Sequence, residues 1–170
     1  MHLILFRHGP AGDHDPARWP SDVDRPLTPK GVARTRLAAR GLARLVSEVA
    51  FILTSPYQRA KETAVILSEA LGVTTVDTID ALASGASPRG MLTAIEKFHP
   101  ERTVILVGHE PDLGMLAGAL IGSARALPLK KAGVCSITFE GPARAGSGTL
   151  AWYLPPRILR KLAGKEVHAV

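Results

Sequence analysis

The sequence alternates short apolar runs with helix-start signals, and this alternation constrains the fold more than any other feature. Three runs are apolar and short enough for buried strands, at residues 3–6, 51–54 and 103–107. A serine or threonine followed by proline, the pair favoured at a helix N-cap and first helical position, occurs at Thr28-Pro29, Ser55-Pro56 and Ser87-Pro88. The alternation predicts an α/β three-layer sandwich, with a mainly parallel central sheet flanked by helices.

Weaker patterns complete the expected order of elements. Residues 10–27 hold four prolines and four aspartates without periodicity and predict a long ordered loop. Helical spacing follows Thr28 as far as Val46, and follows Ser55 to about Leu71, where Gly72 is the expected stop. The remaining expectations are an edge strand at 74–76, a helix from 88 that includes Phe98, a helix at 111–121, a hairpin of strands 134–139 and 149–154, and a short basic helix from 155. The hairpin should add one antiparallel strand.

Size and composition favour one compact domain. The chain has 170 residues, 46% of them hydrophobic, so we expect a single domain over 1–170 with a basic C-terminal segment at 155–170. Cys135 is the only cysteine, which excludes a disulfide framework and a zinc site built on several thiolates. No apolar run has the length of a membrane span, and the first residues do not resemble a signal peptide, so we expect a cytoplasmic protein with no membrane partner.

The positive charge is concentrated in the last quarter of the chain. The net charge is +6, and residues 125–170 hold eight basic and two acidic residues, which accounts for the whole excess. The basic residues are scattered and aromatic residues are only 5%, so we expect no nucleic-acid partner. A solvated surface explains the pattern most simply. A second interpretation is that the basic segment attracts an acidic substrate or protein partner. We expect the protein to act as a monomer.

Titratable residues follow three of the expected strands. Arg7 and His8 follow the first strand, Arg59 lies soon after the second, and His109 follows the strand at 103–107. Ligands of parallel α/β sheets bind outside the carboxyl ends of the strands, so these side chains should converge on one edge.

Two imidazoles and two guanidiniums in one place form an anion site. A guanidinium can bind two oxygens of a tetrahedral anion, which makes phosphate the natural ligand without a metal or cofactor. A neutral His8 could attack phosphorus, with the Gly9 segment supplying a carbonyl that fixes its tautomer. Arg7, Arg59 and His109 would then bind the phosphoryl oxygens.

These residues lie in motifs that resemble those of the histidine phosphatase superfamily, the phosphoglycerate mutase-like group. Arg7-His8-Gly9 resembles its signature and Gly108-His109 its fourth motif. The second and third motifs are matched by Pro26-Leu27-Thr28 with Gly31, and by Ser55-Pro56 with Arg59, Glu62 and Thr63. The motifs occur in the family's order over residues 7–109, and the strand and helix pattern extends the match to about residue 154. The resemblance implies a phosphoglycerate mutase-like fold and a phosphatase that forms a phosphohistidine intermediate.

Within the superfamily, the chain is similar to the SixA-type phosphohistidine phosphatases. Arg25-Pro26-Leu27-Thr28 and Gly108-His109-Glu110-Pro111 carry this similarity. The short chain leaves no room for large cap insertions, which suits a protein substrate. The resemblance implies removal of phosphate from phosphohistidine on a signalling protein, for example a histidine phosphotransfer domain, and signal transduction as the setting.

Mutase-like members of the superfamily use a carboxylic acid to protonate the leaving group, and its identity here stays open. Asp22, Asp24 and Glu110 are candidates, with Asp13 weaker, and Pro10 stands where some relatives have an acid. A phosphohistidine substrate needs such an acid less, because imidazole leaves easily once protonated.

Several residues have two interpretations. Arg25 could bind substrate or pair with Asp22 or Asp24, and the structural role is favoured. Ser55 is first an N-cap and second a substrate contact. Cys135 should be core rather than a nucleophile. Four histidines have no expected catalytic role, namely His2, His14, His99 and His168.

Other functions compete with the phosphohistidine phosphatase. One is hydrolysis of a small phosphomonoester, and another is a phosphate- or phosphoprotein-binding module without turnover. A metal hydrolase would use His8, His109 and an aspartate as ligands, but two arginines beside the site would repel the metal.

Overall fold

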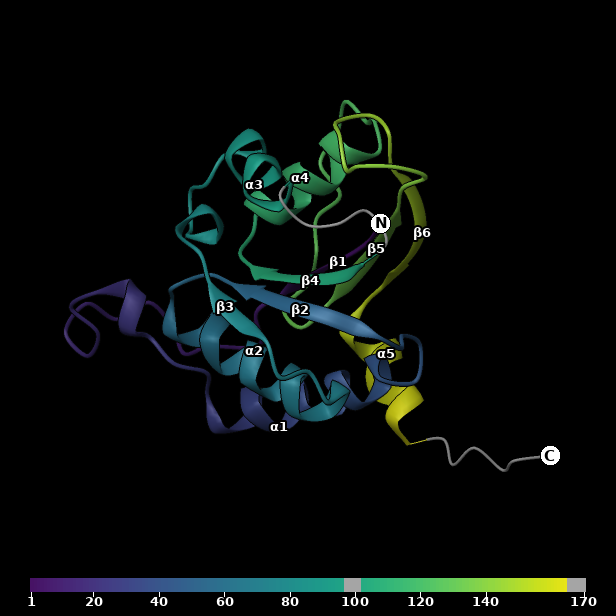
Figure 1. Cartoon of the computed structure of the whole chain (residues 1–170). Coiled ribbons are helices and arrows are strands. Elements are labelled where there is room, and N and C mark those ends of the chain that lie inside the picture. The colour runs from purple at the N-terminus through teal and green to yellow at the C-terminus, as the bar shows by residue number, and fades with distance from the viewer. Residues whose placement is uncertain (97–101, 165–170) are drawn as a thin grey trace.

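The centre of the fold is a six-stranded sheet in the order β3-β2-β4-β1-β5-β6 (Figure 1). The computed structural model describes residues 1–96 and 102–164. Its strands are β1 (His2–Arg7), β2 (Val49–Thr54), β3 (Val76–Thr78), β4 (Thr103–Gly108), β5 (Val134–Thr138) and β6 (Thr149–Leu154). Neighbours among β1 to β4 pair in parallel, whereas β5 is antiparallel to both β1 and β6. The predicted parallel sheet with one antiparallel strand from the hairpin is confirmed.

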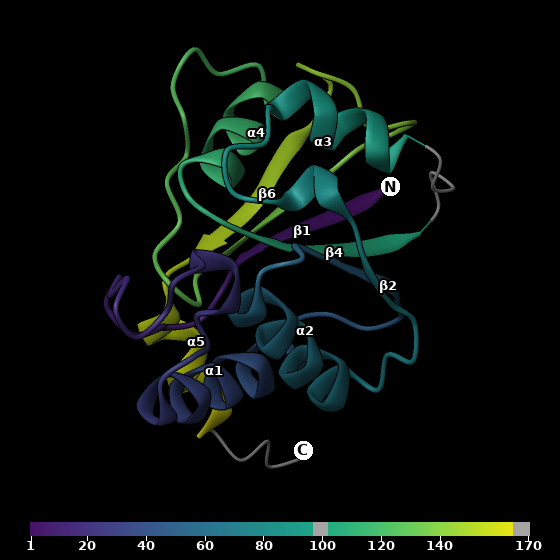
Figure 2. The ribbon, with the colours of Figure 1, turned by 90° about the vertical axis from the view of Figure 1, so that its left-hand side faces the viewer.

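Helices cover both faces of the sheet, which confirms the three-layer sandwich (Figure 2). One face carries α1 (Pro29–Leu42), α2 (Gln58–Leu71) and α5 (Pro156–Ala163). The other carries α3 (Pro88–Ile95) and α4 (Asp112–Leu120). Two short 3-10 helices lie in loops, η1 (Asp22–Asp24) and η2 (Asp80–Leu82). None of the helices in the described part of the chain combines the length and apolar character needed to cross a membrane.

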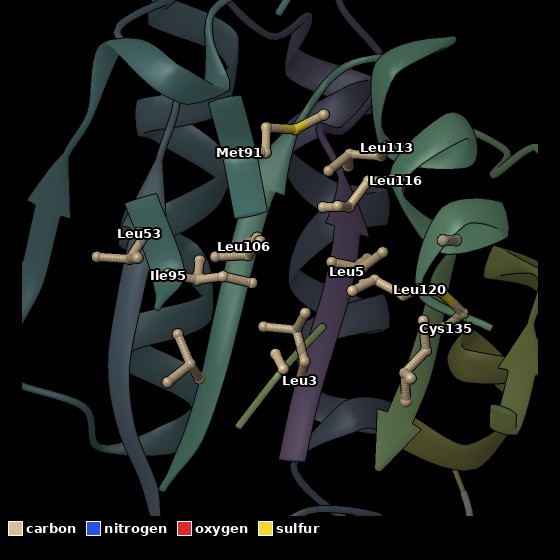
Figure 3. Packing of buried hydrophobic residues seen from close by; sticks show 14 of the residues in the cluster. Leu3, Leu5, Leu53, Met91, Ile95, Leu106, Leu113, Leu116, Leu120 and Cys135 are labelled. Atoms are coloured by element: carbon tan, nitrogen blue, oxygen red, sulfur yellow. The ribbon is translucent and has the colours of Figure 1, made fainter. Parts of the chain in front are cut away.

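The alternation of side chains along β1 divides the core into two halves. Leu3 and Leu5 point to the α3 and α4 side, where they join Met91 and Leu113 (Figure 3). Ile4 and Phe6 join the cluster on the α1, α2 and α5 side. All four β1 side chains are fully buried, as expected for a central strand covered on both faces. The buried strand holds its two ends in fixed positions, and its carboxyl end carries the site.

The first helix begins where the sequence predicts but ends earlier. Thr28 caps α1, because its hydroxyl accepts a hydrogen bond from the backbone N–H of Gly31 at 2.9 Å. The helix ends at Leu42 and not near Val46. Leu37 remains exposed on it, which is the usual state of a single apolar residue on a helix surface.

The second helix departs from the prediction at its start. α2 begins at Gln58 with Tyr57 as N-cap residue, so the prediction of Ser55 as N-cap is wrong. The hydroxyl of Ser55 is engaged in the site instead. The predicted stop is confirmed, since Gly72 adopts the left-handed conformation with φ of 68°.

Other elements lie close to their predicted positions. The loop at 10–27 is irregular except for η1 and one bridge between Ala11 and Leu27. The edge strand lies at 76–78, two residues later than expected. Phe98 and the end of the basic segment, 165–170, lie outside the described residues. The single-domain assignment for 1–170 stays a prediction.

Candidate active site

The carboxyl ends of β1, β2 and β4 meet at one edge, as predicted, because these three strands are parallel neighbours. The backbone N–H of His8 donates to the carbonyl oxygen of Gly108 at 3.1 Å, and that of Ser55 to Val107 at 2.9 Å. These bonds extend the sheet by one residue and place the side chains of three strands together. The ring centroids of His8 and His109 are 5.1 Å apart.

His8 is held in the neutral tautomer that leaves Nε2 free of a proton. Its Nδ1 lies 2.7 Å from the carbonyl oxygen of Gly9, and a carbonyl can only accept, so Nδ1 carries the proton. Arg59 Nε donates to His8 Nε2 at 3.3 Å, which requires a lone pair there. Burial lowers the pKa of His8 to about 3, and the nearby cations act in the same direction. The predicted carbonyl partner is therefore present, and the ring is neutral at neutral pH.

Arg59 lies in the first turn of α2 and is held by the loop that contains η1. Its Nη1 donates to the backbone oxygen of Asp22 at 2.8 Å, and its Nη2 to the Asp22 carboxylate at 2.9 Å. Arg25 Nε donates to the other carboxylate oxygen at 2.7 Å, and Arg25 also bonds the backbone oxygen of Gly12. Arg25 thus makes the structural pair with Asp22 that the sequence favoured. Its contact with substrate stays a prediction.

Ser55 fixes the proton of the second imidazole. Its Oγ accepts from the N–H of Tyr57 at 3.2 Å and lies 2.7 Å from His109 Nε2. We assign the hydroxyl proton to the bond with Nε2, because the described residues offer it no other acceptor. The remaining proton of the neutral ring is then on His109 Nδ1. Burial lowers the pKa of His109 to about 4, with Arg59 adding to the effect.

The Arg7 guanidinium has one hydrogen bond to the residues that the structure describes. Its Nη1 donates to the carbonyl oxygen of Leu129 at 2.8 Å, whereas its buried Nε has no partner among those residues. Burial lowers the pKa of Arg7, but the nearby Glu110 carboxylate opposes the shift.

Two buried side-chain polar atoms lack a hydrogen-bond partner among the described residues, and both belong to this site. They are Arg7 Nε and His109 Nδ1. Both are N–H donors, and a buried donor without a partner is costly unless a ligand satisfies it. The site is thus prepared for an acceptor such as a phosphoryl oxygen. Within the same described residues, no group of three or more His, Cys, Asp or Glu side chains is arranged to hold a metal ion.

The other motif residues hold the segments of the candidate site in place. The Gly9 N–H donates to the hydroxyl of Thr63 at 3.0 Å, and that hydroxyl donates to the backbone oxygen of Arg59 at 2.7 Å. The Leu27 N–H donates to the carboxylate of Glu62 at 2.7 Å. Together these bonds join the loop and the end of β1 to α2.

Tyr57 is a site residue that the sequence reasoning missed. The centroid of its ring lies 4.8 Å from the ring centroid of His109. The guanidinium carbon of Arg59 lies 4.8 Å from the same Tyr57 centroid. Its position in the sequence could have indicated this, because Tyr57 lies between Ser55 and Arg59, two residues expected in the site, at the start of α2.

The acid candidates differ in their environment. Burial alone would raise the pKa of Asp22, but the bonds from Arg25 and Arg59 outweigh it and lower the pKa. Burial raises the pKa of Glu110, whose Oε1 accepts from the Leu129 N–H at 2.9 Å. Asp22 is therefore ionised and bound to two arginines, whereas Glu110 holds a proton more readily. Asp13 and Asp24 are exposed.

The described cysteine and histidines that were expected to have no catalytic role lie in places that agree with this expectation. Cys135 is fully buried in β5, and burial raises the pKa of its thiol to about 12, which disfavours a nucleophilic thiolate. His2 bonds Ser136 near the start of β1, away from the carboxyl edge. His14 is exposed in the loop. His99 and His168 lie outside the described residues.

Comparison with known proteins identifies the family. The family model of the histidine phosphatase superfamily (branch 1) matches residues 3–84. Phosphohistidine phosphatase SixA of Escherichia coli K12 is 26% identical over 159 residues, covering 92% of this chain and 94% of the relative. The chain belongs to the histidine phosphatase superfamily. An uncharacterized protein of Picosynechococcus sp. PCC 7002 is 40% identical, with 88% of this chain and 91% of the relative covered.

Solved structures confirm the phosphoglycerate mutase-like fold. The protein histidine phosphatase SixA complexed with tungstate superposes with a TM-score of 0.81 at 26% identity, covering 94% of this chain and 99% of that one. The structure of a candidate phosphohistidine phosphatase SixA from Agrobacterium tumefaciens has a TM-score of 0.74 at 23% identity, with 91% of this chain and 97% of that chain covered, and it shows the fold alone. Sequence and structure together support the SixA-type assignment and a phosphatase, a hydrolase of phosphoryl groups.

Proposed function

We propose that this histidine phosphatase removes the phosphoryl group from phosphohistidine on a signalling protein in the cytoplasm. The group is carried transiently on Nε2 of His8, with no metal involved. The observation that carries the proposal is the neutral, buried His8, whose Nε2 lone pair is fixed by the bond from Nδ1 to Gly9. A neutral ring nitrogen in a group of cationic and N–H donors is what nucleophilic attack on a phosphoryl group requires.

The reaction has two steps. In the first, the lone pair of His8 Nε2 forms a bond to phosphorus while the bond from phosphorus to the substrate nitrogen breaks. The departing imidazole takes a proton from water. In the second, water attacks phosphorus, the bond to His8 breaks, and phosphate leaves while the proton lost by water passes to solvent.

Three side chains bind the phosphoryl oxygens in this scheme. Arg7 Nε and His109 Nδ1 are the buried donors without partners, so a phosphoryl oxygen at each satisfies the group without displacing an existing bond. Arg59 already donates to the nucleophilic nitrogen of His8, which places its guanidinium beside the phosphorus. These donors stabilise the charge on the equatorial oxygens as it redistributes in the transition state.

Phosphohistidine is favoured over an alkyl phosphate because the two half-buried acid candidates described at the site, Asp22 and Glu110, are already engaged in hydrogen bonds. The Asp22 carboxylate is ionised by its two arginine partners, and the Glu110 carboxylate already accepts from a backbone N–H. An alkoxide leaving group needs a proton donor, whereas imidazole leaves easily once protonated. The similarity to SixA, named as a phosphohistidine phosphatase, supports the same choice.

A small phosphomonoester is the second candidate, and one observation favours it. Burial raises the pKa of Glu110, the residue after His109, so its carboxyl group retains a proton more readily than an exposed one. In this alternative Glu110 protonates the leaving oxygen, after giving up its bond to the Leu129 N–H.

The test compares wild type and His8→Ala on a phosphohistidine-bearing protein and on an aryl phosphate, with EDTA present. His14→Ala, an exposed histidine in the loop, is the matched control. We expect wild type and the control to turn over phosphohistidine, and His8→Ala to retain tungstate binding without turnover.

Other outcomes would overturn parts of the proposal. Activity that survives in His8→Ala, or that EDTA abolishes, contradicts the intermediate on His8. Turnover of the aryl phosphate alone favours the phosphomonoester. Tungstate binding by wild type without turnover of either substrate indicates a binding module.

A further inference from the structure

A second pocket lies beside the active site and is lined by five cationic side chains. Its volume is about 520 Å³, and the cations are Arg7, Arg34, Lys130, Lys131 and Arg160. No acidic side chain contributes to its lining. Arg7 belongs to both places, because its Nη1 bonds the Leu129 carbonyl while its Nε is the unpartnered donor of the active site. The pocket and the phosphate site therefore share one residue, Arg7.

The lysine turn of this pocket is tied to the catalytic strand. The N–H of Ala132 donates to the carbonyl oxygens of both Arg7 and His8, at 3.1 Å each. Ala132 is buried and adopts the left-handed conformation with a φ of 57°, so the chain turns sharply there. Its two hydrogen bonds hold the backbone of this turn against the end of β1. Lys130 and Lys131 directly precede Ala132, whose N–H is bonded to His8, the proposed nucleophile. The backbone that carries the two lysines is therefore attached to the end of β1.

The two helical arginines are placed by close packing of α1 against α5, which lie side by side (Figure 2). A Cβ on Gly41 would lie 1.9 Å from the carbonyl oxygen of Leu159, so the helices touch at backbone level. Leu159 is fully buried, and Arg160 follows it directly. Arg34 lies on α1, two turns before Gly41. The rigid helix pair holds these two cations on the pocket wall.

Four of the five cations form no ion pair within the part of the chain that the structure describes. Within residues 1–96 and 102–164, the ion pairs all involve Asp22, and none includes Arg34, Lys130, Lys131 or Arg160. Like charges held within a Debye length repel one another, so this arrangement is favourable only with an anionic ligand or counterions. Three of the four lie in the basic last quarter of the chain, and the fold brings them to the active site.

We propose that this basic pocket binds carboxylates on an acidic surface that flanks the phosphohistidine of the substrate protein. The inference rests on the proposed function, since the phosphoryl group and the carboxylates belong to one molecule. Arg7 contacts both places, so an occupant of the pocket lies directly beside the phosphoryl group. A protein surface supplies several carboxylates at that distance, matching several cations. No aromatic side chain lines the pocket, which disfavours stacked bases of a nucleic acid.

The test uses two phosphohistidine peptides of equal length, one with glutamates around the phosphohistidine and one with glutamines. The variant is Arg34→Gln/Lys130→Gln/Lys131→Gln, three exposed positions that leave Arg7 intact. The matched control is Arg36→Gln/Arg40→Gln/Lys61→Gln, which removes the same charge from exposed positions on α1 and α2 outside the pocket.

We expect wild type to prefer the glutamate peptide in kcat/KM. Each exposed ion pair contributes a factor of about two to three, so the pocket variant should lose about tenfold on this peptide. Its kcat/KM on the glutamine peptide and on an aryl phosphate should stay within about twofold of wild type. The control variant should keep the preference for glutamate, and added salt should reduce that preference in wild type.

The outcomes separate this inference from the proposed function. Equal turnover of both peptides by wild type and the pocket variant overturns the inference and leaves the function intact. A loss on the glutamate peptide that is as large in the control variant also overturns it, because bulk charge would then suffice. Failure of wild type on both peptides, with turnover of the aryl phosphate, contradicts the proposed function itself.

Discussion

The buried neutral state of His8 should make the fold sensitive to acid, and His8→Asn tests this directly. Burial lowers the pKa of His8 from 6.5 to about 3 in the folded protein, although the bond to Gly9 opposes the shift. Between these two values the unfolded chain binds a proton at this residue and the folded chain does not. The free energy of unfolding therefore falls as the pH falls from about 6.5 towards about 3, and it is recovered as the pH rises.

The size of the effect follows from the depressed pKa. Each pH unit in the window costs about 1.4 kcal/mol, and the first half-unit costs less because the unfolded histidine is only partly protonated. Between about pH 7 and pH 4.5, His8 should account for a loss of about 2–3 kcal/mol, a large part of a typical stability of about 5–15 kcal/mol. The pKa of His109 is lowered to about 4, so this residue also reduces the free energy of unfolding as the pH falls from about 6.5 to about 4.

Urea unfolding of wild type and His8→Asn at these two pH values measures the difference. We expect the variant to lose about 2–3 kcal/mol less than wild type on acidification, whatever its stability at neutral pH. His14→Asn, at an exposed position, should behave as wild type. Equal losses in wild type and His8→Asn would refute the reasoning, since His8 would then titrate alike in both states and would not be held neutral.

Three further changes test the roles assigned above. Ser55→Ala removes the hydroxyl that donates to His109 Nε2, so kcat should fall about tenfold while the circular dichroism spectrum is unchanged; an unaltered kcat would contradict the tautomer assignment. Asp22→Asn should lower kcat on an alkyl phosphate, whose alkoxide leaving group needs a proton donor, by no more than about fivefold, because the Asp22 carboxylate is ionised, whereas loss of a general acid would cost about a hundredfold or more. Gly41→Ala places a Cβ 1.9 Å from the Leu159 carbonyl and should reduce the free energy of unfolding by about 1–3 kcal/mol in urea, and a neutral effect would show that α5 adjusts freely.

The strand ends could be predicted from the sequence because their signals are local. A continuous apolar run such as Leu3 to Phe6 indicates a strand covered on both faces, and the polar residues after it are then at the carboxyl edge. Thr28 and Ser87 could be assigned as caps for the same reason, since a cap bonds an N–H three residues away. The convergence of His8 and His109 followed from parallel pairing alone.

The bonds across the loop could not be predicted, because they join residues far apart in the sequence without periodicity between them. Asp22 was one of several aspartates in the loop, and only the fold shows that it holds Arg59. Ser55 followed by proline matches a helix cap, yet its hydroxyl serves His109 and the helix begins three residues later. The Ser55 hydroxyl still accepts from the nearby Tyr57 N–H, but its contact with His109 joins residues 54 positions apart, which no local pattern in the sequence reports.

The grouping of basic residues in the fold also could not be predicted from the sequence, because these residues are far apart along the chain. The basic excess after residue 124 looks like a solvated surface when counted along the chain, since Lys130 and Arg160 are thirty residues apart. The fold brings both to one pocket and adds Arg7 from the first strand. Because the Arg7 guanidinium is anchored at Leu129 by one nitrogen and unsatisfied at another, an anion in either place acts on the same group. If the pocket binds carboxylates and the site at His8 binds phosphate, as we propose, the two are electrostatically coupled through Arg7, so Arg7→Gln should weaken binding of both anions, whereas Lys130→Gln/Lys131→Gln should mainly weaken binding of the carboxylates.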